Sequence, residues 1–194
     1  MLGDPGVGKS TYYWRLKTGK FVDTDSTKSS LVTMGIAVDH AMAVDGTNIK
    51  AQLFDTGGEE RHRSLTHNYY RGIDGVLLTY SVDDQCTLMN LQQWIESVEE
   101  VNSGDDIEKI TWGIIGNKCD LKSEVSRERV KILCEELGTP LEFLTSAKEG
   151  MNVVESFETV VREIHQRHHG SKLKQDVVDL EKVPHKREGK KDCC

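Results

Sequence analysis

The sequence lacks any apolar run close to the roughly 20 residues that a helix needs to cross a bilayer, and nothing apolar precedes its first motif. These absences argue against a membrane-spanning protein and against a secretory signal peptide. We therefore expect a reducing compartment, in which Cys86, Cys119 and Cys134 are ordinary thiols and no disulfide framework forms. The length of 194 residues, with 37% hydrophobic and 29% charged residues, fits one α/β domain.

Basic charge is also scarce. The chain has 25 Lys and Arg against 32 Asp and Glu, a formal net charge of −7. A domain that binds nucleic acid normally carries a basic stripe that replaces the phosphate counterions. We therefore expect no nucleic-acid partner, so that any nucleotide would be a bound ligand.

Residues 3–10, Gly-Asp-Pro-Gly-Val-Gly-Lys-Ser, fit the phosphate-loop pattern G-x-x-x-x-G-K-[ST]. In such a loop, backbone amides, one lysine and one hydroxyl surround the phosphates of a nucleoside triphosphate. A Gly-rich turn is the alternative, and the later segments disfavour it. The motif normally follows a strand, and the two residues that precede it, Met1 and Leu2, make too short a segment to form one. We therefore expect the first strand of the sheet to be missing or incomplete in this chain.

Strand-like and helical patterns alternate along the rest of the sequence. Residues 9–16 predict the helix after the phosphate loop, with its N-terminus directed at the phosphates. Asp45-Gly46, between apolar runs at 34–44 and 48–54, predicts a β-hairpin. The remaining patterns are buried strands at 75–80 and 110–115, a helical period over 88–98, a helix at 126–137, a strand at 141–145 and an amphipathic helix over 153–164. This order predicts a doubly wound, mostly parallel α/β sheet.

Three polar segments follow predicted strands, at the edge where α/β sheets bind ligands. Asp55 can hold Mg²⁺ through water, and the amide of Gly58 can approach a γ-phosphate, although an ordinary Asp/Gly turn is the alternative. In the segment 117–120, Asn-Lys-Cys-Asp, Asp120 can accept both hydrogens that guanine presents and adenine does not. The segment 145–148, Thr-Ser-Ala-Lys, can supply a backbone amide to the guanine oxygen.

In this order, the segments resemble the Ras superfamily of small GTPases over nearly the whole chain, apart from the first strand. Within that superfamily, four shorter segments resemble the Rab branch, which directs vesicle traffic: Arg61–Thr66, Tyr69–Gly72, Leu77–Tyr80 and the terminal Cys193-Cys194. The resemblance implies the P-loop small-GTPase fold, with GTP or GDP and Mg²⁺ as cofactors.

The resemblance also implies a role for each matching residue. The catalytic group would be Lys9, Thr33 and Glu59, and the Mg²⁺ ligands would be Ser10, Thr33 and Asp55. The nucleotide-binding residues would be Gly6, Val7, Gly8, Lys9, Ser10, Thr11, Phe21, Gly58, Asn117, Lys118, Asp120, Ser146, Ala147 and Lys148. Thr33 is preferred because Thr33-Met34-Gly35-Ile36 is similar to the family's Thr-Ile-Gly-Val; a plain strand-edge threonine is the alternative.

Two departures from the family pattern bear on hydrolysis. Glu59 stands where the family has the glutamine that orients the attacking water. A carboxylate about 4 Å from another negative charge, at an effective dielectric of about 20, is opposed by roughly 4 kcal/mol. Glu59 should therefore swing away from the γ-phosphate or take a proton. Pro5 also occupies a loop position where Rabs usually have a small residue, and its ring could hinder a water or an inserted finger. We expect slow hydrolysis without an activating protein.

The composition turns polar and charged after Gly170, which predicts a small GTPase domain over 1–169 and a disordered tail over 170–194. Cys193 and Cys194 resemble the Rab double geranylgeranylation site, which would give stable anchoring; two free thiols are the alternative. His165, His168 and His169 have metal-ligand spacing, but a solvated helix end is the favoured interpretation.

Two classes of function remain open. The first is a GTP-binding switch in membrane traffic, lipid-anchored to the cytoplasmic face of intracellular membranes and cycling with the cytosol. Its partners would be an exchange factor, an activating protein, an escort protein, a dissociation inhibitor and effectors. The second is an interaction protein that binds nucleotide without hydrolysing it, or binds none. A phosphate-loop ATPase is a weaker third option, against which Asp120 argues.

Overall fold

The computed structural model describes residues 1–22, 37–55, 70–102 and 104–180. Its helices and strands follow in the order α1 (Lys9–Thr18), β1 (Ala37–Val44), β2 (Thr47–Phe54), β3 (Gly75–Ser81), α3 (Gln85–Met89), α4 (Leu91–Glu99), α5 (Asp105–Lys109), β4 (Thr111–Asn117), α6 (Arg127–Glu136), β5 (Glu142–Leu144) and α7 (Val153–Leu180). The helical period predicted over 88–98 belongs to two helices, α3 and α4, which meet at Asn90.

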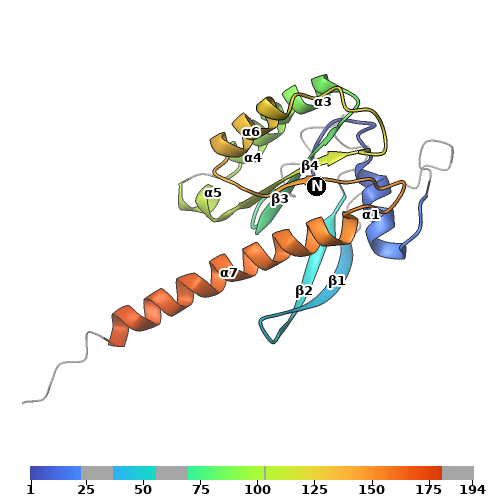
Figure 1. The fold of residues 1–194 in the computed structure, drawn as a ribbon. Helices are drawn as coiled ribbons and strands as arrows, with labels where there is room; N and C mark the ends of the chain where they lie inside the picture. Colours follow the sequence, from blue (N-terminus) through green and yellow to red (C-terminus); the bar gives the residue numbers. More distant parts are fainter. Residues whose placement is uncertain (23–36, 56–69, 103, 181–194) are drawn as a thin grey trace, which may run out of the picture.

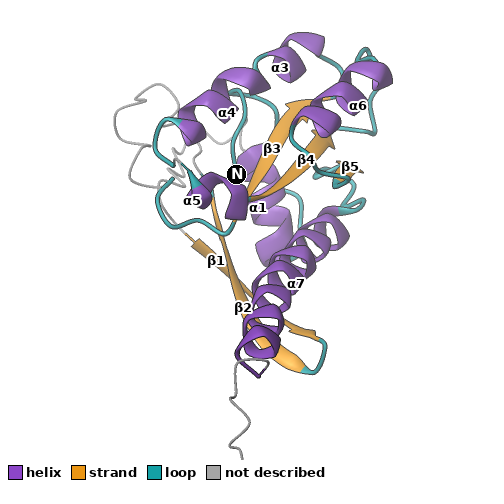
Figure 2. Ribbon diagram, turned by 90° about the vertical axis from the view of Figure 1, so that its left-hand side faces the viewer, coloured by secondary structure: helices purple, strands orange, loops and turns teal. Residues whose placement is uncertain are grey.

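Strands β3, β4 and β5 form a parallel sheet in that order, with helices on both faces (Figures 1 and 2). Alternate side chains of a strand point to opposite faces. Leu78 and Ile114 therefore pack in a core with α3, α4 and α6, while Leu77 and Ile115 pack in a second core with α1 and α7. The predicted α/β fold with a parallel sheet is confirmed, and the two buried faces explain the unbroken apolar runs.

Strands β1 and β2 form an antiparallel hairpin whose register runs from Ala37 opposite Phe54 to Val44 opposite Thr47. The two connecting residues, Asp45 and Gly46, have φ angles of 49° and 78°. Two positive φ angles define the type I′ turn, which matches the right-handed twist of the strands. The predicted hairpin is confirmed.

The N-terminal residues lie between this hairpin and the parallel sheet. Leu2 forms an isolated parallel bridge with Leu78. Its amide donates to the Leu77 carbonyl over 2.9 Å and its carbonyl accepts from the Thr79 amide over 2.7 Å. Within the described residues no longer strand occupies this position, and the sheet β1-β2 stays separate from the sheet β3-β4-β5.

Helix α7 is longer than the sequence predicted. It extends ten residues beyond Gly170, to Leu180, whereas the composition predicted a disordered tail from 170. A single glycine inside a helix costs only about 1 kcal/mol relative to alanine, and a helix that has already nucleated continues with little further loss. The prediction of no helical structure after Gly170 is therefore wrong for these residues. None of the helices in the described part of the chain combines the length and the apolar character required to cross a bilayer.

Candidate functional site

The phosphate-loop motif forms a loop that wraps the N-terminus of α1. Gly6 and Gly8 have φ angles of 81° and 94°, in the left-handed region that favours glycine. At Gly3, an added Cβ would lie 2.0 Å from the Thr79 carbonyl oxygen, so a larger residue would displace the loop from β3. The glycines at these positions therefore allow the loop to turn and to approach the sheet closely.

Lys9 begins α1 and is buried, with 4% of its surface exposed. Its ammonium donates to the carbonyl oxygens of Gly3 over 2.7 Å and Asp4 over 2.8 Å. The cation is thus held inside the loop, beside the backbone amides at the helix N-terminus. This arrangement provides fixed positive charge and amide donors for an anion such as a phosphate group.

The segment predicted to bind the base is joined directly to this loop. Asn117, 1% exposed, donates from Nδ2 to the Val7 carbonyl over 2.9 Å. Its Oδ1 accepts from the Thr145 hydroxyl over 3.2 Å and from the Ala147 amide over 3.1 Å. One amide side chain therefore links three predicted segments, which the parallel sheet brings to the same edge.

Asp120 and Ser146 meet at the outer side of this network. The Ser146 hydroxyl donates to Asp120 Oδ1 over 2.5 Å, and the Glu149 amide donates to the same hydroxyl over 3.0 Å. Asp120 is exposed, so its carboxylate is oriented by Ser146 and remains accessible to a ligand. Lys118 precedes it with a φ of 63°, a left-handed conformation at a non-glycine residue.

Arg15 supports the segment 145–148, which the sequence predicts to bind the base, and no sequence pattern indicated this residue. Its Nε donates to the Ala147 carbonyl over 2.8 Å, and its guanidinium also donates to the Lys148 carbonyl. A third donor reaches the Gly19 carbonyl over 2.9 Å at the end of α1. Nothing in the local pattern could have identified this role, because Ala147 and Lys148 lie more than 130 positions away.

Two further contacts missed by sequence reasoning fix the start of the phosphate loop. The Asp4 carboxylate accepts from Asn90 Nδ2 over 2.6 Å and from the Trp94 indole over 3.0 Å. The apolar period around Trp94 indicated a core residue, and the structure shows that its polar edge anchors the loop.

Asp55 follows β2 and is buried, with 1% exposure. Ser10 lies in the first turn of α1, beside Lys9. Mg²⁺ prefers hard oxygen ligands, and a carboxylate with a hydroxyl supplies them. The donor set of these two residues therefore fits the ion. The third predicted ligand, Thr33, lies outside the described residues.

The structure describes two of the remaining predicted site residues, and the others lie outside the described ranges. Thr11 is half-buried in α1, and Phe21 lies beyond the end of α1 with 45% exposure. Gly58, Glu59, Cys193 and Cys194 fall in the residues that the structure leaves undescribed. In the described part of the chain, no group of three or more His, Cys, Asp or Glu side chains could hold a metal ion.

Cys119 lies in the segment 117–120, which the sequence predicts to bind the base. Burial and the neighbouring Asp120 carboxylate raise the pKa of its thiol. The thiol therefore stays protonated at neutral pH, which lowers its reactivity. The sequence-based interpretation of an ordinary thiol agrees with this environment.

A parallel sheet with a glycine-rich loop, a buried lysine at a helix N-terminus and a polar segment after the next strand defines the phosphate-loop class of nucleotide-binding domains. A sequence model of the Ras family matches residues 1–166. The chain is 38% identical over 180 residues to Ras-related protein RAB1BV of Beta vulgaris, covering 91% of this chain and 79% of that protein.

Other relatives show the same branch of the family. Ras-related protein Rab-8B of Dictyostelium discoideum is 39% identical over 171 residues, or 86% of this chain and 79% of that protein. GTP-binding protein ypt2 of Schizosaccharomyces pombe is 40% identical over 168 residues, or 84% of this chain and 78% of that protein. The chain therefore belongs to the Ras family of small GTPases, in its Rab branch.

Proposed function

We propose that this protein is a guanine-nucleotide switch in membrane traffic that binds effectors in its GTP state. The observation that carries the proposal is the pair Asp120 and Ser146, in which the hydroxyl orients an exposed carboxylate. A fixed carboxylate accepts from the N1–H and N2 amine of guanine, and adenine offers no matching pair of donors. The link from Asn117 to the Val7 carbonyl fixes the spacing between the base and the phosphates.

Different residues of the site would bind the phosphates, the Mg²⁺ ion and the guanine base. Lys9 would exchange its carbonyl partners for β- and γ-phosphate oxygens, together with the loop amides of Gly6 and Gly8. Ser10, Asp55 and Thr33 would hold Mg²⁺, which supplies charge neutralisation at the phosphates when bound. Phe21, exposed in this structure, would pack against the guanine ring.

The identity of the bound nucleotide tests this function. Purified chain, denatured and analysed by chromatography, should release guanine nucleotide and no adenine nucleotide. Asp120→Ala should lower GDP affinity by about 10-fold or more, because a hydrogen bond to a charged group contributes roughly 1.5–3 kcal/mol. Glu124→Ala, on the same exposed loop, serves as the matched control. Equal affinity of the two variants for GDP would exclude Asp120 as the guanine acceptor.

We also propose that hydrolysis is slow without an activating protein. Glu59 carries a negative charge where the attacking water must be oriented beside the γ-phosphate, and Pro5 narrows the same region. Activating proteins of the type usual for Rabs supply both an arginine and a glutamine, and would restore turnover. In single-turnover assays, Glu59→Gln should hydrolyse GTP faster than the unsubstituted chain. Equal rates would contradict the proposal.

A second candidate is an interaction protein that binds nucleotide without hydrolysing it. Glu59 is the observation that favours it, since an ionised carboxylate accepts hydrogen bonds but lacks the N–H donors of the glutamine amide. The released nucleotide separates the two functions: mostly GDP indicates turnover, and mostly GTP indicates a protein that binds without hydrolysis.

The membrane part of the proposal rests on Cys193 and Cys194. Two geranylgeranyl chains would give stable anchoring to the cytoplasmic face of intracellular membranes, whereas a single chain is marginal. An escort protein would present the chain for prenylation, and a dissociation inhibitor would extract the GDP form to the cytosol. An exchange factor would reload it. Replacing both cysteines by serine should move the protein to the soluble fraction of cells; persistent membrane association would contradict the proposed anchor.

A further inference from the structure

The side chain of Tyr12, on α1, is buried and bonds to the first turn of α7. Its hydroxyl donates to the Val153 carbonyl over 2.8 Å and lies 2.8 Å from the Ser156 hydroxyl. Val153 begins α7, and this end of the helix lies beside α1 (Figures 1 and 2). One side chain therefore joins the helix that follows the phosphate loop to the start of α7.

The Tyr12 hydroxyl keeps its proton and acts as a hydrogen-bond donor. Burial raises the pKa of the phenol, and the hydrogen bond with Ser156 opposes this rise only in part. Val153 and Ser156 are buried as well, so the bond lies away from solvent. A buried polar group left without its partner costs free energy, and the three groups therefore hold one another in a fixed geometry.

The start of α7 is fixed in turn to the segment 145–148, which is predicted to bind the base. The amide of Ser146 donates to the Met151 carbonyl over 3.1 Å and closes the loop between them. The Asn152 side chain, next along the chain, donates to the Leu144 carbonyl over 2.8 Å. Because these bonds close the loop at both ends, a shift at the start of α7 is transmitted to the residues that precede it.

Arg15 supports the same loop from the same helix. Its guanidinium donates to the carbonyls of Ala147 and Lys148. Residues three positions apart are neighbours on a helix surface, so Tyr12 and Arg15 hold the two ends of the loop from one face of α1. The same helix begins with Lys9, which bonds to the phosphate loop. Helix α1 thus fixes the position of the predicted base site relative to the phosphate loop.

We propose that Tyr12 is a positioning residue for guanine recognition, because its hydroxyl fixes the start of α7 and thereby the position of Ser146. The inference rests on the proposed function, in which Asp120 accepts hydrogen bonds from guanine. The Ser146 hydroxyl donates to Asp120 over 2.5 Å. A shift of Ser146 turns this carboxylate away from the N1–H and the N2 amine of the base, and misalignment weakens both bonds. Tyr12 acts on the nucleotide only through these residues.

The test compares GDP with inosine diphosphate on the full 194-residue chain. Inosine diphosphate lacks the N2 amine, so the ratio of its Kd to that of GDP measures how well Asp120 is aligned with the base. Tyr12→Phe keeps the buried ring and removes only the hydroxyl. We expect fluorescent GDP to leave about 3- to 10-fold faster and the Kd ratio to fall by about threefold or more, as the loss of one hydrogen bond implies. Affinity for inorganic pyrophosphate should stay the same.

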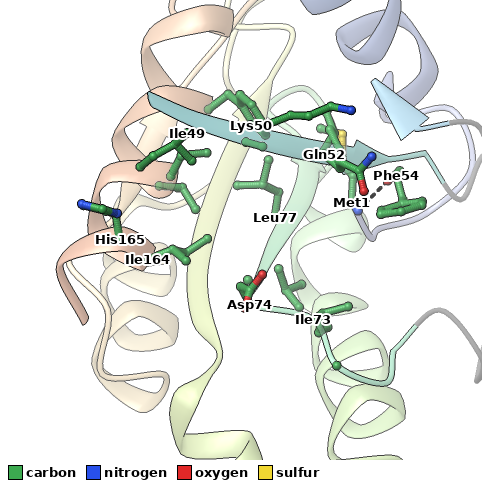
Figure 3. Close-up of a pocket in the computed structure, with 18 of the residues that line it drawn as sticks. Met1, Ile49, Lys50, Gln52, Phe54, Ile73, Asp74, Leu77, Ile164 and His165 are labelled. Carbon is green, nitrogen blue, oxygen red and sulfur yellow. Dashed lines mark hydrogen bonds between the residues drawn. The ribbon is translucent and has the colours of Figure 1, made fainter. Parts of the chain in front are cut away.

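A matched variant on α7 separates this role from packing alone. Ile164 lies further along α7, beside a cavity of about 690 Å³ between β2 and β3 (Figure 3). None of the described residues that line this cavity belongs to the segment 145–153. Ile164→Ala should therefore lower the free energy of unfolding in urea and leave the Kd ratio unchanged. An unchanged ratio in Tyr12→Phe, or an equal change in both variants, would overturn the proposal.

The unsubstituted chain shows whether the proposed function itself holds. A chain that binds GDP no better than ADP would overturn the proposed function and the role of Tyr12 together. A chain that prefers GDP, and whose Kd ratio is unaffected by Tyr12→Phe, would overturn only the role of Tyr12.

Discussion

The indole of Trp94 donates a 3.0 Å hydrogen bond to Asp4 Oδ1, and Asn90 donates over 2.6 Å to the other carboxylate oxygen. The phosphate loop is thereby attached to the junction of α3 and α4, 86 to 90 residues further along the chain. Asp4 also presents its carbonyl to Lys9. Asp4 therefore anchors the loop through its side chain and accepts a hydrogen bond from Lys9 through its backbone carbonyl.

Removing the Asp4 side chain should weaken nucleotide binding and speed the release of GDP. In Asp4→Ala, both hydrogen bonds to a charged acceptor are lost, and such bonds contribute roughly 1.5–3 kcal/mol each. We expect faster release of fluorescent GDP, by about 10-fold, in stopped-flow chase experiments. Trp94→Phe removes one donor and should give a smaller increase. The double variant should be less than additive, since both changes break the same contact. Release at the original rate in Asp4→Ala would show that the anchor does not control the loop.

Asn117 should be essential for nucleotide binding because its buried side chain links the phosphate loop to the segment 145–148. In Asn117→Asp, the donor to the Val7 carbonyl becomes a second acceptor, and two oxygens are forced together in a buried position. A buried unsatisfied polar group costs about 1–3 kcal/mol, and a charged one costs more. We expect a lower free energy of unfolding in urea and a loss of GDP binding. Asn152→Asp, at an exposed position, is the control and should change neither by a similar amount.

Substitution of Arg15 should weaken binding of the guanine base more than binding of the phosphates. Arg15→Lys keeps the charge but cannot reproduce the fork that reaches the carbonyls of Ala147 and Lys148. We expect GDP release to accelerate by about 3- to 10-fold, while affinity for inorganic pyrophosphate stays the same. Lys17→Ala, two residues further along α1, removes a cation near the rings of Tyr13 and Trp14 and should leave GDP release unchanged. A slower GDP release in Arg15→Lys would contradict the proposed support.

The stability of the chain that begins at Met1 should depend on pH through its α-amine. The amine has a pKa of 8.0 when exposed, and burial lowers this pKa to about 6 in the folded protein. Between pH 6 and 8 the unfolded chain therefore binds more protons, so the free energy of unfolding rises with pH across this window. Two pKa units correspond to roughly 3 kcal/mol.

Urea unfolding at pH 6 and pH 8 measures this difference. Acetylation of the N-terminus removes the titrating charge, so the acetylated chain should lose this part of the pH dependence while histidines and carboxylates contribute as before. The same pH dependence in both forms would show that the Met1 amine does not titrate as its burial implies.

Local sequence was sufficient for much of the fold and part of the site. The glycines at 3, 6 and 8 identify the phosphate loop because each is required by a close approach or a positive φ. Asp45-Gly46 identified the hairpin because few residue pairs accept two positive φ angles. The runs at 75–80 and 110–115 identified buried parallel strands, and their ends gave the position of Asn117. These signals depend on neighbours within a few residues, which is the range that a sequence pattern covers.

The tertiary structure alone decided which distant residues meet. The contacts of Arg15 with 147 and 148, of Asp4 with Trp94 and of Asn117 with Val7 join segments separated by 90 to 133 positions. Each depends on the order in which strands and helices assemble, and no local period encodes that order. The sequence by itself determined the chemistry that each segment carries, and long-range packing determined where that chemistry converges.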